Sequence, residues 1–287
     1  MAFAIQILSL ALIACIGIIV FQFFPKDFSA KKISLTAMFV LLSAILQAVS
    51  VMLPLFGFPS LKIGFSQMPL LLLGALLGPV WAYIGGICQD IVSLIVDPTS
   101  FPFFGFTLNK IVVALIPAFW FTYGSKISQK TLFILTEVII VCTYLLGLFA
   151  LFTTGEIMSG GEMYHLNIWV KLGLSAVIIL FLGILCYGIH YFYKKYQGTH
   201  NKAGQWIISI ISVEVIVQYC LTPLWLSVMY GVPFMGSLLV RLVKGSVMIF
   251  LNILIGLMLY RILSKLIKND NEEQEVDLEL ITDKADD

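Results

Sequence analysis

Long apolar runs follow one another along almost the whole chain and constrain its fold more than any other feature. Nine stretches, bounded by Lys, Pro, Gly or Asn, qualify as membrane segments: 2–24, 33–54, 66–77, 79–96, 107–124, 131–153, 166–192, 206–230 and 237–264. A helix of about 20 apolar residues crosses a bilayer. Only 11% of the residues are charged, against about 25% in soluble domains. The sequence therefore predicts an all-α polytopic membrane protein.

The distribution of lysine and arginine orients these segments. Residues 66–96 contain the helix-breaking pair Gly78-Pro79, so they form either one kinked span or a hairpin of two short ones. Loops on the cytoplasmic side carry the excess of basic residues. A hairpin puts the basic residues of 26–32, 126–130, 194–202 and 261–268 on one side, with only Lys62 and Lys171 on the other. We therefore predict nine segments, an outer amino terminus and a cytosolic carboxyl terminus.

The near-zero net charge is a sum of two opposed regions. Nine of the 16 acidic residues lie between Asp270 and Asp287, with only Lys284 among them, so this end is near −8 and the remainder, with 16 basic and seven acidic residues, is near +9. A polar, acidic segment without aromatic residues buries little apolar area. We predict that 269–287 is a disordered, cytosolic tail, either simply solvated or a partner-binding segment.

Motifs for the common enzyme classes are missing from the sequence. It contains no GxxxxGK[ST] phosphate loop, no HExxH pair and no G-x-S-x-G elbow. The three histidines and five cysteines have no metal-ligand spacing. We therefore expect no enzymatic activity, no catalytic residue, no metal and no cofactor.

Polar side chains inside the spans give the strongest indication of a binding site. An ionisable group in hydrocarbon costs at least ~2.5 kcal/mol and usually faces a cavity or a partner. The set is Gln47, Gln67, Gln89, Asp90, Asn109, Lys110, Glu214, Gln218, Arg241 and Lys244, and six of them fall in the outer halves of their helices: Gln47, Gln67, Asp90, Asn109, Lys110 and Arg241. With Trp225, Tyr230 and the loop residue Lys62, they predict a cationic pocket open to the outside. Alternatively, Asp90 pairs with Lys110 or Arg241 to tie helices together, and the aromatic residues form an interfacial belt.

Four stretches together resemble a known family. They read ISLTAMFV (33–40), IGFSQMPLLLLGALLGPVWAYIGGICQDIVSLI (63–95), FPFFGFTLNKIVVALIP (101–117) and TPLWLSVMYGVPFMGSLLVRLVK (222–244). In this order they are similar to the substrate-binding S component of energy-coupling factor (ECF) transporters, most closely the folate-type branch.

The resemblance implies a six-helix core with additions. The first four core helices fall in 31–128 and the last two in 204–268. The additions are an amino-terminal helix in 1–30, an inserted helix pair in 129–203, and the acidic tail.

The resemblance also implies a function and partners. Such a subunit captures a vitamin with high affinity outside a bacterial plasma membrane and docks on a transmembrane T component driven by two cytosolic ATPases. It then topples to release the vitamin inward, and no nucleic acid is involved. Family members dock through small residues on the first core helix, a role for which Ala37, Ala44 and Ala48 are the candidates, although packing within the bundle explains them equally well.

For a folate-like ligand, each candidate has a chemical role. Aromatic stacking would come from Phe103, Phe104, Trp225 and Tyr230, and carboxylate binding from Lys62, Arg241 and Lys244. Asp90, Gln89 and Asn109 would read a 2-amino-pyrimidinone edge. Gln67 and Lys110 complete the candidate substrate site.

Three alternatives stay open. The chain is a stand-alone ion-coupled transporter using Asp90, Lys110 and Glu214, an intramembrane enzyme, or an S component for another vitamin or precursor. Intramembrane catalysis would need paired catalytic groups at one depth, and the sequence has none with recognisable spacing.

Overall fold

The computed structural model describes residues 2–55, 58–96, 102–153, 155–159, 162–196 and 202–283. Its α-helices are α1 (Ala2–Phe23), α2 (Ala30–Ala48), α3 (Gln67–Leu77), α4 (Pro79–Val96), α5 (Phe104–Tyr123), α6 (Gln129–Thr153), α7 (Ile168–Tyr196), α8 (Ala203–Val213), α9 (Thr222–Tyr230) and α10 (Phe234–Asp283). A 3₁₀ turn, η1 (Gly124–Lys126), follows α5, and a π-helix, η2 (Glu214–Leu221), joins α8 to α9. Two hairpins, β1 (Val51–Leu55) with β2 (Phe58–Ile63) and β3 (Glu156–Ser159) with β4 (Glu162–His165), complete it.

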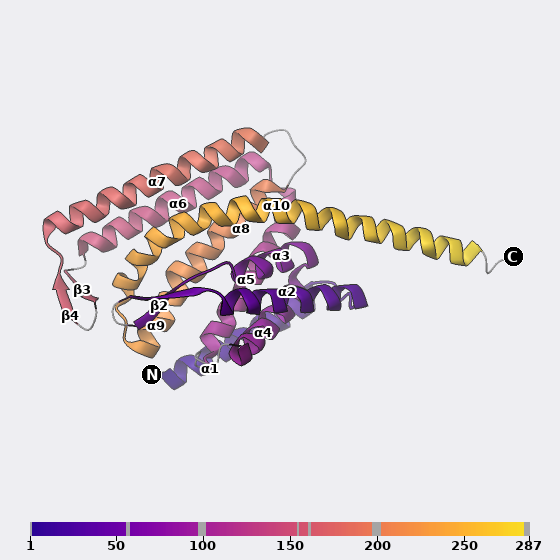
Figure 1. The fold of residues 1–287 in the computed structure, drawn as a ribbon, viewed down its shortest axis with the longest axis horizontal. Helices are drawn as coiled ribbons and strands as arrows, with labels where there is room; N and C mark the ends of the chain where they lie inside the picture. The colour runs from indigo at the N-terminus through magenta and orange to yellow at the C-terminus, as the bar shows by residue number, and fades with distance from the viewer. Residues whose placement is uncertain are drawn as a thin grey trace.

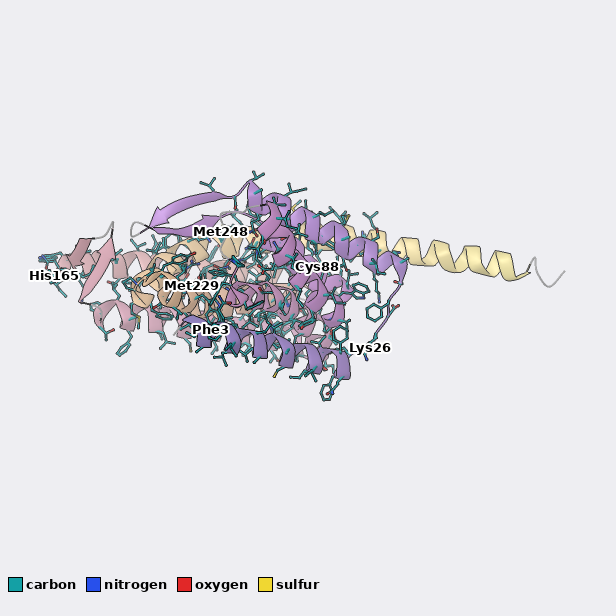
Figure 2. All side chains as sticks on the ribbon, turned by 90° about the horizontal axis from the view of Figure 1, so that it is seen from below. Phe3, Lys26, Cys88, His165, Met229 and Met248 are labelled. Atoms are coloured by element: carbon teal, nitrogen blue, oxygen red, sulfur yellow. The ribbon has the colours of Figure 1, made fainter. Side chains whose placement is uncertain are left out.

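The predicted polytopic helical fold is confirmed. Among the described residues, eight helical segments are long and apolar enough to cross a membrane, one of them the continuous α8-η2-α9 segment at 203–230. The remaining predicted segment, 66–77, corresponds to α3, which is apolar but has only 11 residues. Both hairpins lie at one end of the bundle with the amino terminus, opposite the end toward which α10 extends (Figure 1). Lys26 and His165 also lie at opposite ends (Figure 2), as the predicted alternation of loops requires.

The break at Gly78-Pro79 separates two helices, as predicted. Gly78 has φ 87°, a left-handed conformation that glycine adopts without a steric penalty. Its N–H donates to the Gly74 carbonyl and ends α3. Pro79 then opens α4, where a proline's missing N–H costs nothing.

The hairpins differ from the sequence-based expectation. The span predicted at 33–54 ends as helix at Ala48, and Val51 already pairs with Ile63 in an antiparallel ladder. The register shifts between Leu53 and Pro54, which is where a strand can tolerate a residue without a backbone N–H. Apolarity had suggested helix here, but a short apolar run fits a strand equally well.

Helix α10 is longer than the predicted span at 237–264, because it continues to Asp283. It thus runs through most of 269–287, where we expected a disordered tail. Glu and Leu recur in this segment, and both residues have high helix propensity.

Close helix contacts hold the centre of the bundle together. α5 packs on both α3 and α4. A Cβ at Gly74 would lie 1.9 Å from the Ala114 carbonyl oxygen, and one at Gly86 would lie 2.7 Å from Ile111 Cα. Only glycine allows these backbones to approach so closely. Helix α5 is thereby held in place against both neighbours.

The additional helices pack against this centre. α1 lies on α4 and α5, where the Tyr83 hydroxyl donates to the Ile13 carbonyl at 3.1 Å. α6 and α7 pack on each other and against α8 and α10. Large apolar side chains such as Trp169 and Tyr187 remain exposed on α7, as expected for a surface that faces lipid.

Candidate functional site

A cavity of about 510 Å³ lies between the membrane helices. Its walls come from α2, α3, α4, α5, η2, α9 and α10, so it draws on both ends of the sequence. Its polar lining consists of Gln47, Ser66, Gln67, Asp90, Ser93, Asn109, Lys110, Glu214, Gln218, Thr222, Tyr230, Arg241, Lys244 and Asn252. This volume falls within the range of about 300–1,000 Å³ typical of small-molecule sites.

The π-helix forms one wall. Thr222 donates its backbone N–H to the Val217 carbonyl five residues back, the spacing of a π-turn. Pro223 follows, and because it has no N–H it cannot form the usual bond to Tyr219. Glu214, Val217 and Gln218 all face the cavity from this segment.

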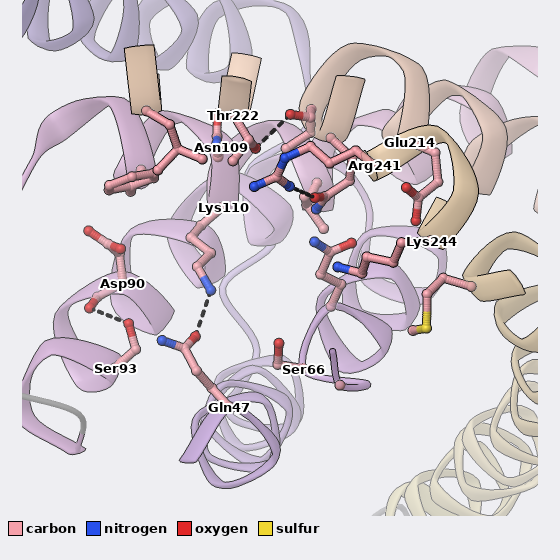
Figure 3. A pocket seen from close by; sticks show the side chains of 18 of the residues that line it. Gln47, Ser66, Asp90, Ser93, Asn109, Lys110, Glu214, Thr222, Arg241 and Lys244 are labelled. Atoms are coloured by element: carbon pink, nitrogen blue, oxygen red, sulfur yellow. Dashed lines mark hydrogen bonds between the residues drawn. The ribbon is translucent and has the colours of Figure 1, made fainter. Parts of the chain in front are cut away.

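Helix α10 supplies the cationic part of the site. Arg241 and Lys244 lie one turn apart, and both line the cavity. Arg241 is almost fully buried; its Nη1 donates to Gln218 Oε1 at 3.0 Å and its Nε to Ser237 Oγ at 3.3 Å. Figure 3 shows Glu214 on the same side of the cavity as these two cations. The wall therefore combines two cations with one carboxylate.

The opposite wall is built from α2, α4 and α5. Thr107 Oγ1 donates to Asp90 Oδ2 at 2.6 Å. Gln47 Oε1 accepts from both Lys110 Nζ at 2.7 Å and Gln89 Nε2 at 3.1 Å. These bonds hold a carboxylate, an amide and an ammonium group at fixed positions on this side of the cavity (Figure 3).

Asn109 connects the two walls. Its Nδ2 donates to Thr222 Oγ1 at 3.2 Å, and its Oδ1 accepts from Trp225 Nε1 at 2.9 Å. Trp225 is itself buried against Phe103, with ring centroids 5.7 Å apart. Trp225 thus supports the wall from behind.

The predicted site residues separate into two groups. Seven of the eleven candidates line the cavity together: Gln67, Asp90, Asn109, Lys110, Tyr230, Arg241 and Lys244. Gln89 and Trp225 lie behind the wall, and Phe104 is 42% exposed while the adjacent Phe103 lines the cavity. The side chain of Lys62 lies outside the described residues.

The three docking candidates on α2 differ in exposure. Ala37 and Ala48 are exposed, whereas Ala44 is buried within the bundle. The outward face of α2 carries Leu41 and Ile45 between the two exposed alanines. Residue 44 lies only about 20° from residue 37 around the helix axis. It is at the edge of the buried face that carries Val40 and Gln47, where its small side chain is covered.

Several lining residues are not among the eleven predicted substrate-site residues. Gln47, Glu214 and Gln218 belong to the polar set inside the spans, which is the signal that identifies them. Ser66, Ser93, Thr222, Met248 and Asn252 have no comparable signal, because such residues also occur on helix faces that line nothing. In the part of the chain that the structure describes, no three His, Cys, Asp or Glu side chains form a metal-binding group.

Comparisons with known proteins bear on this site. Residues 31–168 match the family model described as ECF transporter, substrate-specific component. A curated relative, "Folate transporter FolT" from Clostridium novyi (strain NT), is 34% identical over 83 residues, which are 29% of this chain and 48% of that protein. The chain thus matches about half the length of this relative. A solved structure described as "Crystal structure of FolT bound with folic acid" is similar with a TM-score of 0.47 and 20% identity, over 82% of this chain and 98% of that one.

Proposed function

We propose that this chain, which belongs to the ECF transporter substrate-specific component family, captures folate or a folate-like compound outside the cell membrane for import. The observation that carries the proposal is the cavity of about 510 Å³ with its cationic α10 wall. The curated relative named as a folate transporter supports the choice of ligand.

The charges of the lining suit an anion. Lys110, Arg241 and Lys244 stand against Asp90 and Glu214, a formal excess of one positive charge. A folate carboxylate would accept hydrogen bonds from the Arg241 guanidinium and the Lys244 ammonium group. Charge-assisted bonds of this kind are the strong ones in a site shielded from water.

The opposite wall suits the other end of such a molecule. The Asp90 carboxylate can accept two N–H donors, and a 2-amino-pyrimidinone edge presents two. Asn109 adds both a donor and an acceptor at the boundary between the walls. A ligand with an amine-bearing ring at one end and carboxylates at the other would satisfy both walls.

Import by this mechanism needs partner subunits. We propose that a transmembrane T component and two cytosolic ATPases form the rest of the importer. The T component would contact the exposed face of α2, where Ala37 and Ala48 allow a second helix to approach.

Two measurements test this function. Purified protein titrated calorimetrically with folic acid should bind one molecule per chain, and thiamine, a cationic vitamin, should not compete. Vesicles that contain only this chain should bind folic acid without accumulating it. Accumulation driven by an ion gradient would instead establish a stand-alone transporter. Absence of folic acid binding together with tight binding of another vitamin would assign a different substrate.

A further inference from the structure

The inserted pair α6–α7 lines no part of the cavity, yet α6 contacts the helix that carries its cations. Leu242 follows Arg241 in sequence and therefore faces about 100° round the helix axis from it. On this adjacent face α6 meets α10, and the contact is close. A Cβ at Gly147 would lie 2.3 Å from Leu242 Cδ1.

Tyr144 is the polar anchor of this contact. Its side chain is 1% exposed, and its hydroxyl hydrogen-bonds the Ser246 hydroxyl and lies 3.4 Å from the Leu242 carbonyl oxygen. Ser246 in turn donates to the Leu242 carbonyl at 2.8 Å. Tyr144 therefore contacts α10 at 242 and 246, on either side of Lys244.

The π-helix secures the same segment of α10 from another direction. Tyr219 is buried, and its hydroxyl fits against the α10 backbone where Gly245 has no side chain; a Cβ there would lie 2.0 Å from Tyr219 Oη. The cavity's cations thus lie on a helix segment fixed between α6 and η2.

We propose that Tyr144 is a positioning residue for the substrate site: through Ser246 and Leu242 it sets the rotation of α10 that directs Arg241 and Lys244 into the cavity. The inserted pair then determines affinity for the anionic part of the ligand, although it touches no ligand itself. This inference rests on the proposed function only for the identity of the anion.

The binding test compares two probes, folic acid and 6-hydroxymethylpterin, which keeps the pterin ring and has no carboxylate. Tyr144→Phe should raise the Kd of folic acid about tenfold and that of 6-hydroxymethylpterin less than about twofold, and it should lower the thermal midpoint by only a few degrees, as the loss of one hydrogen bond requires. The matched control is Tyr187→Phe on α7, whose side chain is 74% exposed and which should change neither Kd. Ser246→Ala should reproduce the Tyr144→Phe effect, and the double variant should add little to it. If Tyr144→Phe weakened the binding of both probes equally, or changed the binding of neither, the proposal would be overturned.

A second measurement needs no ligand, so it separates this inference from the proposed function. Lys244→Cys, in a chain whose native cysteines are replaced by alanine, is labelled with a small charged methanethiosulfonate. Tyr144→Phe should change the labelling rate at least threefold, and Tyr187→Phe should leave it unchanged. If the parent chain binds neither probe but this rate changes as stated, the proposed function fails and the positioning role stands. An unchanged rate would refute the positioning role.

Discussion

Arg241 gives the sharpest test of the pocket, because its guanidinium is held in place before any ligand binds. It is almost fully buried and is fixed by Gln218 at 3.0 Å and Ser237 at 3.3 Å. A hydrogen bond that involves a charged group contributes about 1.5–3 kcal/mol. Since about 1.4 kcal/mol corresponds to a factor of ten in affinity, Arg241→Gln should raise the Kd for folic acid roughly 10- to 150-fold.

The nature of the substitution separates charge from geometry. Arg241→Lys keeps the positive charge but loses the planar fork that binds a carboxylate through two parallel hydrogen bonds. We expect it to weaken binding severalfold, and by less than Arg241→Gln does. Calorimetric titration of each purified variant gives the Kd and the stoichiometry.

Arg261→Gln is the matched control. Arg261 lies on the same helix, 20 residues further on, which is about 30 Å along the axis. Its guanidinium lies over the Tyr196 ring, 4.9 Å from the centroid, and does not line the cavity. Its removal should leave the Kd unchanged. Equal binding by Arg241→Gln and the parent, or equal losses in both variants, would refute the placement of the anion at α10.

Three further predictions concern other parts of the molecule. Asp90→Asn should raise the Kd for folic acid about tenfold, because a charge-assisted hydrogen bond is lost, and should change the thermal midpoint little. An unchanged Kd would show that the Asp90 carboxylate does not bind the ligand. Gly74→Ala, whose Cβ would lie 1.9 Å from the Ala114 carbonyl oxygen, should destabilise the protein by about 1–3 kcal/mol in thermal unfolding. Gly183→Ala, with open space around it, should be neutral or stabilising, and equal effects of the two would contradict the close packing. Trp225→Phe removes the indole N–H that donates to Asn109 Oδ1 at 2.9 Å. Because one hydrogen bond contributes about 1 kcal/mol, the change should weaken folic acid binding a few-fold. An unchanged Kd in calorimetry would show that Trp225 does not support the site.

The helical framework was predictable because the bilayer imposes it. Apolar runs of spanning length are helical, and Gly78-Pro79 interrupts one of them where the structure separates α3 from α4. The hairpins were not predictable on the same basis. At 51–63 the chain is apolar, yet it lies beyond the end of α2, and only pairing between Val51 and Ile63 distinguishes strand from helix there.

The binding site was predictable as a set of residue types and depths, but not in detail. Asp90 and Gln89 are adjacent polar residues in one predicted span, and sequence alone cannot say which of them faces the cavity. In the structure Asp90 lines the cavity, whereas Gln89 lies behind the wall and donates a hydrogen bond to Gln47, which itself lines the cavity. The contribution of α6 could not be predicted from the sequence either. Tyr144 acts through packing on α10, and its contacts there are 98 residues or more away along the chain.

The most direct test of the central claim is mass spectrometry of the small molecule that co-purifies with the chain in mild detergent. The pocket as described predicts one compound per chain, with a carboxylate at one end and an amine-bearing ring at the other. That compound should be lost in Arg241→Gln and retained in Arg261→Gln. An empty preparation that also binds no member of a vitamin panel would contradict capture of a vitamin-like substrate.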